Sequence, residues 1–276
     1  MQDLIEIFQA DFVWRALIAG IMISLSAALL GVILMLKRYS LIGHALADVG
    51  FASLSIAVAV GWSPLYVSLP IVIVASFLIM LISQKRAVNG DVAIGMVATA
   101  SLAAGVIITN LTRGFNIDVY SYMFGSILSI SKADVWRSTL LSFAVIAVFI
   151  VFYNRLFAVT FDESFARAGG IPVTFYQFLI SLLTAVAIVI GMRMMGTMLI
   201  SSLIIFPAVT AKKLAPGFKG VIFASALISV ICFIAGFVLS CLYDLPAGAS
   251  IVMTNVILLC AVSLLKYICV RSRSKG

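Results

Sequence analysis

Long apolar runs constrain the fold of this chain more than any other feature of its sequence. A helix needs about 20 predominantly apolar residues to cross the hydrocarbon core of a bilayer, and runs of that length recur along all 276 residues. Hydrophobic residues make up 64% of the sequence and charged residues 10%, whereas soluble domains contain roughly 25% charged residues. The sequence therefore predicts an all-α polytopic membrane protein, in which residues 1–276 form a single transmembrane domain.

Charged and turn-forming residues divide the apolar sequence into about nine predicted spans. Pro207 is expected to break the seventh span, and eight crossings are the alternative if that broken helix does not cross completely. A shorter and more polar segment, residues 120–131, suits an interfacial or re-entrant helix. The predicted spans cover residues 12–36, 41–60, 65–83, 92–111, 136–152, 173–191, 194–211, 221–242 and 249–268.

Most lysines and arginines fall on one side of the membrane when the nine spans are threaded in order. The positive-inside rule assigns that side to the cytoplasm, so the N-terminus is expected outside and the C-terminus in the cytoplasm. The formal net charge of +8 then reflects topology in a lipid bilayer and does not indicate binding to nucleic acid. The residues on this side are Lys37, Arg38, Lys85, Arg86, Arg155, Arg167, Lys212, Lys213, Lys219, Lys266, Arg271, Arg273 and Lys275.

His44, the only histidine in the sequence, precedes Asp48 by four residues inside the second predicted span. Residues at this spacing share one face of a helix, with Cβ atoms about 5–6 Å apart, so one cation can contact both side chains. Ionisable groups inside a span are costly and mark ion or proton pathways. An imidazole with a carboxylate suits Zn²⁺, Mn²⁺ or Fe²⁺, although a lone histidine near a helix end also fits an interfacial position.

The polar segment at residues 154–172 is the longest loop predicted on the cytoplasmic side. Phe161 and Phe165 are spaced to share one face of a short amphipathic helix. Residues 169–170, both glycine, supply a stop for that helix, and Pro172 suits the head of the next one. Such a helix is either a docking surface for a soluble partner or an ordinary interfacial helix.

Three segments together resemble the membrane subunit of the ABC-3 metal importers, which serve zinc, manganese and iron. Residues 37–48 (KRYSLIGHALAD) resemble the family segment Arg-Arg-x-Ser-Leu-x-Gly-Asp-Ala-Leu-x-His. Residues 161–172 (FDESFARAGGIP) are similar to its cytoplasmic segment Asp-Glu-x-x-Ala-x-x-x-Gly-hydrophobic-Pro. Residues 196–211 (GTMLISSLIIFPAVTA) are similar to its segment Gly-x-Leu-hydrophobic-Ser-hydrophobic-Pro-Ala-x-x-Ala.

The resemblance implies a type II ABC importer permease that works as a homodimer. It implies two cytoplasmic ATP-hydrolysing subunits and an extracytoplasmic metal-binding protein as partners. ATP hydrolysis is expected on a separate chain, because this sequence holds no GxxxxGK[ST] phosphate loop. The resemblance makes residues 154–172 the segment that couples to the ATPase, through Phe161, Asp162, Glu163, Phe165, Ala166, Gly169 and Gly170.

The same resemblance makes His44 and Asp48 the metal contacts, although the family order is aspartate first and histidine second. Two ligands per chain, four across a dimer axis, suit a transported ion that must be released, so no permanently bound cofactor is expected. Zinc and manganese are the leading candidates for this ion, with iron behind them. Ser201, Ser202, Pro207 and Thr210 are weaker candidates for lining the pathway, and their hydroxyls equally suit backbone groups that the proline frees.

Other classes of membrane protein fit the sequence less well. A single histidine excludes an HExxH zinc protease, and no GxSxG nucleophile elbow is present. A secondary transporter or exporter of cations, not coupled to an ATPase, is the main alternative. It would need more buried ionisable groups than this chain has, and usually an inverted repeat.

Overall fold

The computed structural model describes residues 11–83, 90–112, 132–243 and 245–273, and every regular element in these ranges is an α-helix. Nine of the described helices are long and apolar enough to cross a membrane, which confirms the predicted number of spans. The segment at residues 120–131, expected to be interfacial or re-entrant, lies outside the described residues. In chain order the helices are α2 (Asp11–Leu36), α3 (Ile42–Val60), α4 (Pro64–Ser83), α5 (Gly90–Leu111), α7 (Lys132–Val151), α8 (Tyr153–Phe161), α9 (Glu163–Ala168), α10 (Val173–Met195), α11 (Thr197–Leu214), α12 (Phe218–Tyr243) and α13 (Ala247–Arg273).

The prediction that Pro207 breaks the seventh span is wrong. Helix α11 continues through Pro207 to Leu214, and the break falls at Gly196, between α10 and α11, where φ is +88°. Glycine adopts that backbone conformation without a Cβ clash. A proline inside a helix removes one backbone hydrogen bond, but α11 is packed among α2, α12 and α13, and neighbouring helices make such a loss tolerable in a membrane protein.

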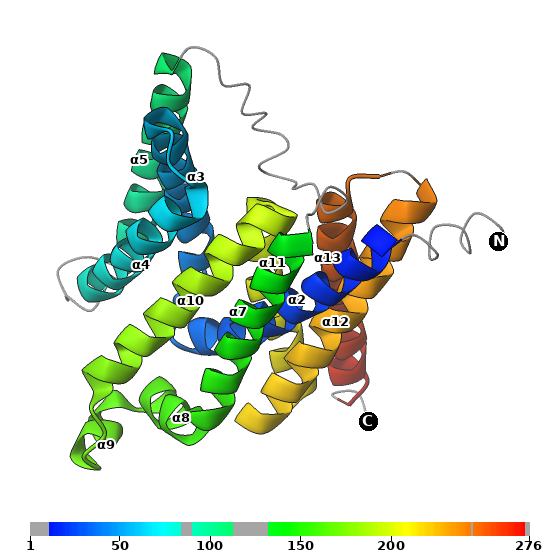
Figure 1. The fold of residues 1–276 in the computed structure, drawn as a ribbon. Helices are drawn as coiled ribbons and strands as arrows, with labels where there is room; N and C mark the ends of the chain where they lie inside the picture. Colours follow the sequence, from blue (N-terminus) through cyan, green and yellow to red (C-terminus); the bar gives the residue numbers. More distant parts are fainter. Residues whose placement is uncertain (1–10, 84–89, 113–131, 244, 274–276) are drawn as a thin grey trace.

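The helices form two groups in the ribbon (Figure 1). Helices α3, α4 and α5 pack on one another, and α2, α7, α10, α11, α12 and α13 form the larger group. The groups meet mainly where α4 packs on α10, with smaller contacts of α3 on α10 and α11. Helix α3, which carries His44 and Asp48, therefore stands at the boundary between the two groups.

Serine hydroxyls link helices across apolar interfaces. Ser229 Oγ donates to the Ser24 carbonyl oxygen at 3.0 Å and joins α12 to α2. The hydroxyls of Ser76 and Ser181 lie 2.6 Å apart and join α4 to α10. Small polar residues of this kind are typical of contacts between membrane helices, and the second pair ties the two groups of helices together.

Helices α2 and α11 approach each other closely at Gly31. A Cβ placed there would lie 2.0 Å from the Ile204 carbonyl oxygen, so only glycine fits without a shift of one backbone. Close approach over small residues increases van der Waals contact in a bilayer, where apolar burial gives no driving force between helices. At Gly31, the backbones of α2 and α11 are therefore in direct contact within the larger group of helices.

Candidate metal site and coupling segment

A tight turn sends the chain from α2 into α3, just before the candidate metal ligands. The Tyr39 amide donates to the Leu34 carbonyl oxygen at 2.8 Å, while Arg38 takes a left-handed conformation with φ +63°. This is the geometry of a helix C-terminus closed by one left-handed residue. The Ile42 amide then donates to the Tyr39 carbonyl oxygen at 3.0 Å, and α3 begins at once.

His44 and Asp48 lie on one face of α3, with Nε2 and Oδ2 3.8 Å apart. The imidazole sits in the first turn and is 61% exposed, whereas the carboxylate, one turn further, is 13% exposed. Their separation exceeds a normal hydrogen bond. Metal bonds of about 2.0–2.2 Å to nitrogen and oxygen let one ion reach two atoms roughly this far apart. The pair can thus accept a shared cation.

This pair has no third ligand of the usual types nearby in the described part of the chain. Within that part, no three residues among histidine, cysteine, aspartate and glutamate come together. Zinc in proteins is usually four-coordinate. An ion held here needs further ligands from water or from another chain.

The four candidate pathway residues on α11 are all buried within the chain. Ser201 Oγ donates to the Thr197 carbonyl oxygen and Ser202 Oγ to the Leu199 carbonyl oxygen, both at 2.8 Å. Pro207 deprives the carbonyl four residues earlier, that of Leu203, of its donor, so neither hydroxyl bonds to the freed group. Thr210 is 1% exposed. The helix approaches α3 elsewhere, where the Ile204 side chain packs beside Gly43.

Two helices, not one, form the candidate coupling segment at residues 154–172. Asp162 is extended, with φ −147° and ψ 102°, and separates α8 from α9. Its Oδ1 accepts a hydrogen bond from the Phe165 amide at 2.9 Å, as an N-cap residue does. The expectation that Phe161 and Phe165 share one face of a single helix is therefore wrong, because aspartate at this position ends one helix and starts the next.

The two phenylalanines occupy different surroundings. The Phe161 ring, at the end of α8, has its centroid 4.8 Å from that of Phe157 and 5.8 Å from that of Phe218. Phe165, on α9, is 72% exposed. Ala166 faces inward and is buried. Helix α8 thus packs on the bundle through its aromatic rings, although Phe161 remains 59% exposed, and α9 presents Phe165 outward.

The end of α9 follows the predicted pattern. Gly169 is the C-cap residue, and Gly170 is left-handed with φ +76°. The Ile171 amide donates to the Ala166 carbonyl oxygen at 3.0 Å, which closes the helix. Pro172 is the N-cap residue of α10.

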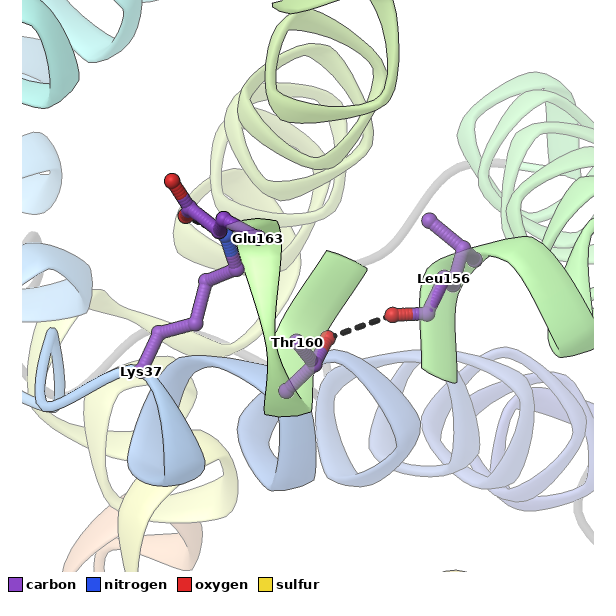
Figure 2. A network of polar contacts seen from close by, with 4 residues as sticks. All are labelled: Lys37, Leu156, Thr160 and Glu163. Carbon is purple, nitrogen blue, oxygen red and sulfur yellow. Dashed lines mark hydrogen bonds and ion pairs between the residues drawn. The ribbon is translucent and has the colours of Figure 1, made fainter. Parts of the chain in front are cut away.

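An ion pair joins α9 to the turn between α2 and α3 (Figure 2). Lys37 Nζ lies 2.7 Å from Glu163 Oε1, with the lysine side chain 5% exposed and the glutamate 45% exposed. Burial raises the pKa of Glu163, but the hydrogen bond and charge of Lys37, with help from Gln177 and Arg167, outweigh burial and lower it. In the same view, Thr160 Oγ1 donates to the Leu156 carbonyl oxygen at 2.6 Å within α8.

Sequence reasoning missed this pairing. The sequence assigned Lys37 to the cytoplasmic side and to one family-like segment, and Glu163 to the candidate coupling segment, with nothing to bring the two together. The one available signal is that the two residues belong to two of the three family-like segments.

Comparisons with known proteins agree with the fold and with the family that the three segments resemble. The model of the ABC 3 transport family matches residues 9–266. The chain is 29% identical to the manganese transport system membrane protein MntC of Halalkalibacterium halodurans, over 90% of this chain and 85% of that protein. It is 26% identical to the high-affinity zinc uptake system membrane protein ZnuB of Haemophilus influenzae, over 90% of this chain and 95% of that one.

A solved structure, PsaBC from Streptococcus pneumoniae in complex with Fab, is also similar. It superposes with a TM-score of 0.84 at 26% identity, over 95% of this chain and 94% of that one. Since the family model spans nearly the whole sequence, this chain belongs to the ABC 3 transport family.

Proposed function

We propose that this chain is the membrane-spanning permease subunit of an ATP-driven importer of divalent metal ions, zinc or manganese first and iron after them. The ion passes from an extracytoplasmic binding protein to the cytoplasm through a pore between two copies of the chain. Membership of the family supports this function. The names of two relatives, one for manganese transport and one for zinc uptake, support the choice of metals.

The pair of His44 and Asp48 is the observation that carries the proposal. A nitrogen and an oxygen ligand lie 3.8 Å apart on one helix, and the imidazole is open to the outside of the single chain. Two copies facing each other would supply four such ligands, a set that suits Zn²⁺ and Mn²⁺. A site shared between chains separates when they move apart, which favours release of the ion.

The short helices α8 and α9 are assigned to the cytoplasmic side, where they meet the ATPase. This assignment goes with an outside N-terminus and a cytoplasmic C-terminus, and it follows from the distribution of basic residues. The exposed Phe165 ring is an apolar knob of the kind that fills a groove on a partner. ATP hydrolysis belongs to that partner, since this chain has no phosphate loop.

The test is transport by the reconstituted complex. The chain is co-expressed with its ATPase subunits, placed in liposomes and supplied with the binding protein and radioactive zinc or manganese. Uptake that requires both ATP and the binding protein is the expected result, and His44→Ala should reduce it by about tenfold or more. Uptake driven by a proton or sodium gradient without ATP would overturn the proposal in favour of a secondary transporter.

A further inference from the structure

The segment formed by α8 and α9 is fastened to the bundle at distinct places. Helix α8 is held by Arg155, whose Nη1 donates to the Tyr176 hydroxyl of α10 at 2.7 Å, and by Phe157, whose ring centroid lies 4.9 Å from that of Phe218 of α12. Helix α9 is held through Glu163, which bonds to Lys37 at 2.7 Å and also to Gln177 of α10. Of these ties, only the bond to Lys37 leads to the turn that starts α3.

That turn is too short and too well bonded to absorb a displacement. Seven positions separate Lys37 from His44, and backbone hydrogen bonds run along them. The Lys37 amide donates to the Ile33 carbonyl oxygen at 3.0 Å, and the His44 amide donates to the Leu41 carbonyl oxygen at 3.1 Å. Segments with such bonding move as units and not as flexible linkers. A displacement of Lys37 is therefore expected to reach the first turn of α3 as well as the end of α2.

Burial of the lysine side chain opposes separation of the ion pair, although the glutamate is partly exposed. The Lys37 side chain is 5% exposed, and a buried ammonium without its anion is costly. If α9 moved and the α2–α3 turn stayed in place, Lys37 would lose this partner. The two segments are thus constrained to move together.

We propose that Lys37 and Glu163 are positioning residues that transmit movement of α9 to the helix turn carrying His44 and Asp48. When α9 follows the ATPase, the ion pair shifts the start of α3 and with it the metal ligands. Because this role presupposes metal import by the chain, it rests on the proposed function. Neither residue contacts the ion, so their effect is on coupling and not on metal affinity.

The experiment measures metal uptake and ATP hydrolysis in the same proteoliposomes, with the complete complex and its binding protein. Lys37→Met should leave ATP hydrolysis running, and Lys37→Met and Glu163→Gln should each lower the uptake of metal per ATP hydrolysed by about tenfold, within the usual range of coupling between sites. The charge-reversed pair, Lys37→Glu with Glu163→Lys, should recover part of the ratio. Lys219→Glu, which reverses the charge of an exposed lysine at the start of α12, is the control. It should leave the uptake of metal per ATP unchanged.

The outcomes separate this role from a structural one and from the proposed function. A purely structural role would lower uptake and ATP hydrolysis together at a constant ratio, and that result would overturn the inference. A double reversal no better than either single reversal would overturn it as well. If Lys37→Met fails to assemble, Glu163→Gln, on an exposed helix, decides the matter. Failure of the unaltered complex to import metal would instead refute the proposed function.

Discussion

Lys37 Nζ and Glu163 Oε1 lie 2.7 Å apart although 126 positions separate the two residues in sequence. The bond joins two of the three segments by which the chain resembles its family. One of these segments holds the candidate metal ligands and the other holds α9. The sequence similarity in both segments therefore corresponds to a physical contact between them.

The pH dependence of this contact follows from the lowered pKa of Glu163. The carboxylate contributes stability that is fully present above its ordinary pKa of 4.5 and is lost as the pH falls through the lower folded-state value. Glu163→Gln should cost about 1 kcal/mol, a modest value because the carboxylate is partly exposed. Thermal unfolding in detergent should show a constant difference from the unaltered chain above about pH 5 and a shrinking one below.

A difference that changes between neutral pH and about pH 5.5 would contradict this pKa. Glu163→Asp, one methylene shorter, is the matched variant, since it keeps the charge and shortens the reach to Lys37. It should retain the pH profile and lose part of the stability.

The order of His44 and Asp48 is open to a direct test by exchange. His44→Ala or Asp48→Ala should each lower metal uptake by about tenfold or more, because each removes one of the two ligands on the shared face of α3. The exchanged variant, His44→Asp with Asp48→His, keeps both ligand types on that face. We expect it to take up more radioactive zinc or manganese than either alanine variant.

Leu41→Ala is the control for the exchange, because Leu41 is exposed and lies one turn before His44. It should leave uptake unchanged. If the exchanged variant is as inactive as the alanine variants, then the depth of each ligand decides function, and a shared face is an insufficient description of the site.

Phe165 should matter for assembly and not for folding. Its ring is 72% exposed on α9, so its removal loses little packing within the chain. Exposed aromatic residues at partner surfaces often contribute about 2 kcal/mol or more to binding. Phe165→Ala should thus reduce the amount of ATPase that co-purifies, at an unchanged melting temperature.

Phe223 offers a closely matched comparison. It is 73% exposed on α12, and Phe223→Ala should retain full co-purification. If both variants lost the same amount of co-purifying ATPase, the effect would come from removing any exposed aromatic side chain. In that case α9 would have no special part in docking.

The number of spans was predictable because each apolar run is long enough to cross a bilayer by itself. The residues at which the spans begin and end were less predictable. The fifth helix starts at Lys132 and not at residue 136, since backbone hydrogen bonding continues through polar residues at the membrane surface. The break before α11 follows the backbone freedom of Gly196, which outweighed the lost hydrogen bond at Pro207.

The candidate site was predictable only where its contacts are local. The shared face of His44 and Asp48 follows from helical spacing. Asp162 also carried a signal, because aspartate favours the N-cap over the interior of a helix, and the i, i+4 spacing of Phe161 and Phe165 obscured it. The bond of Lys37 to Glu163 depends on how the packing of α2 and α10 positions the turn after α2 beside α9, which precedes α10. No local sequence pattern determines that packing.

Gly31 should be among the least replaceable residues in the membrane region. Its missing side chain brings α2 against the Ile204 carbonyl oxygen of α11, where a Cβ would sit at 2.0 Å. Gly31→Ala must therefore push two backbones apart and should cost about 1–3 kcal/mol. Gly95 of α5 is the matched control, because a Cβ there meets nothing within 4 Å. Gly95→Ala should be neutral or stabilising by up to about 1 kcal/mol.

Thermal unfolding of the purified variants in detergent measures both effects. A melting temperature of Gly31→Ala equal to that of the unaltered chain would mean that α2 and α11 stand further apart than in this structure. Because α11 also packs beside Gly43 through Ile204, a displaced α11 should disturb the first turn of α3. Gly31→Ala is therefore expected to lower metal uptake as well as stability, whereas Gly95→Ala lowers neither.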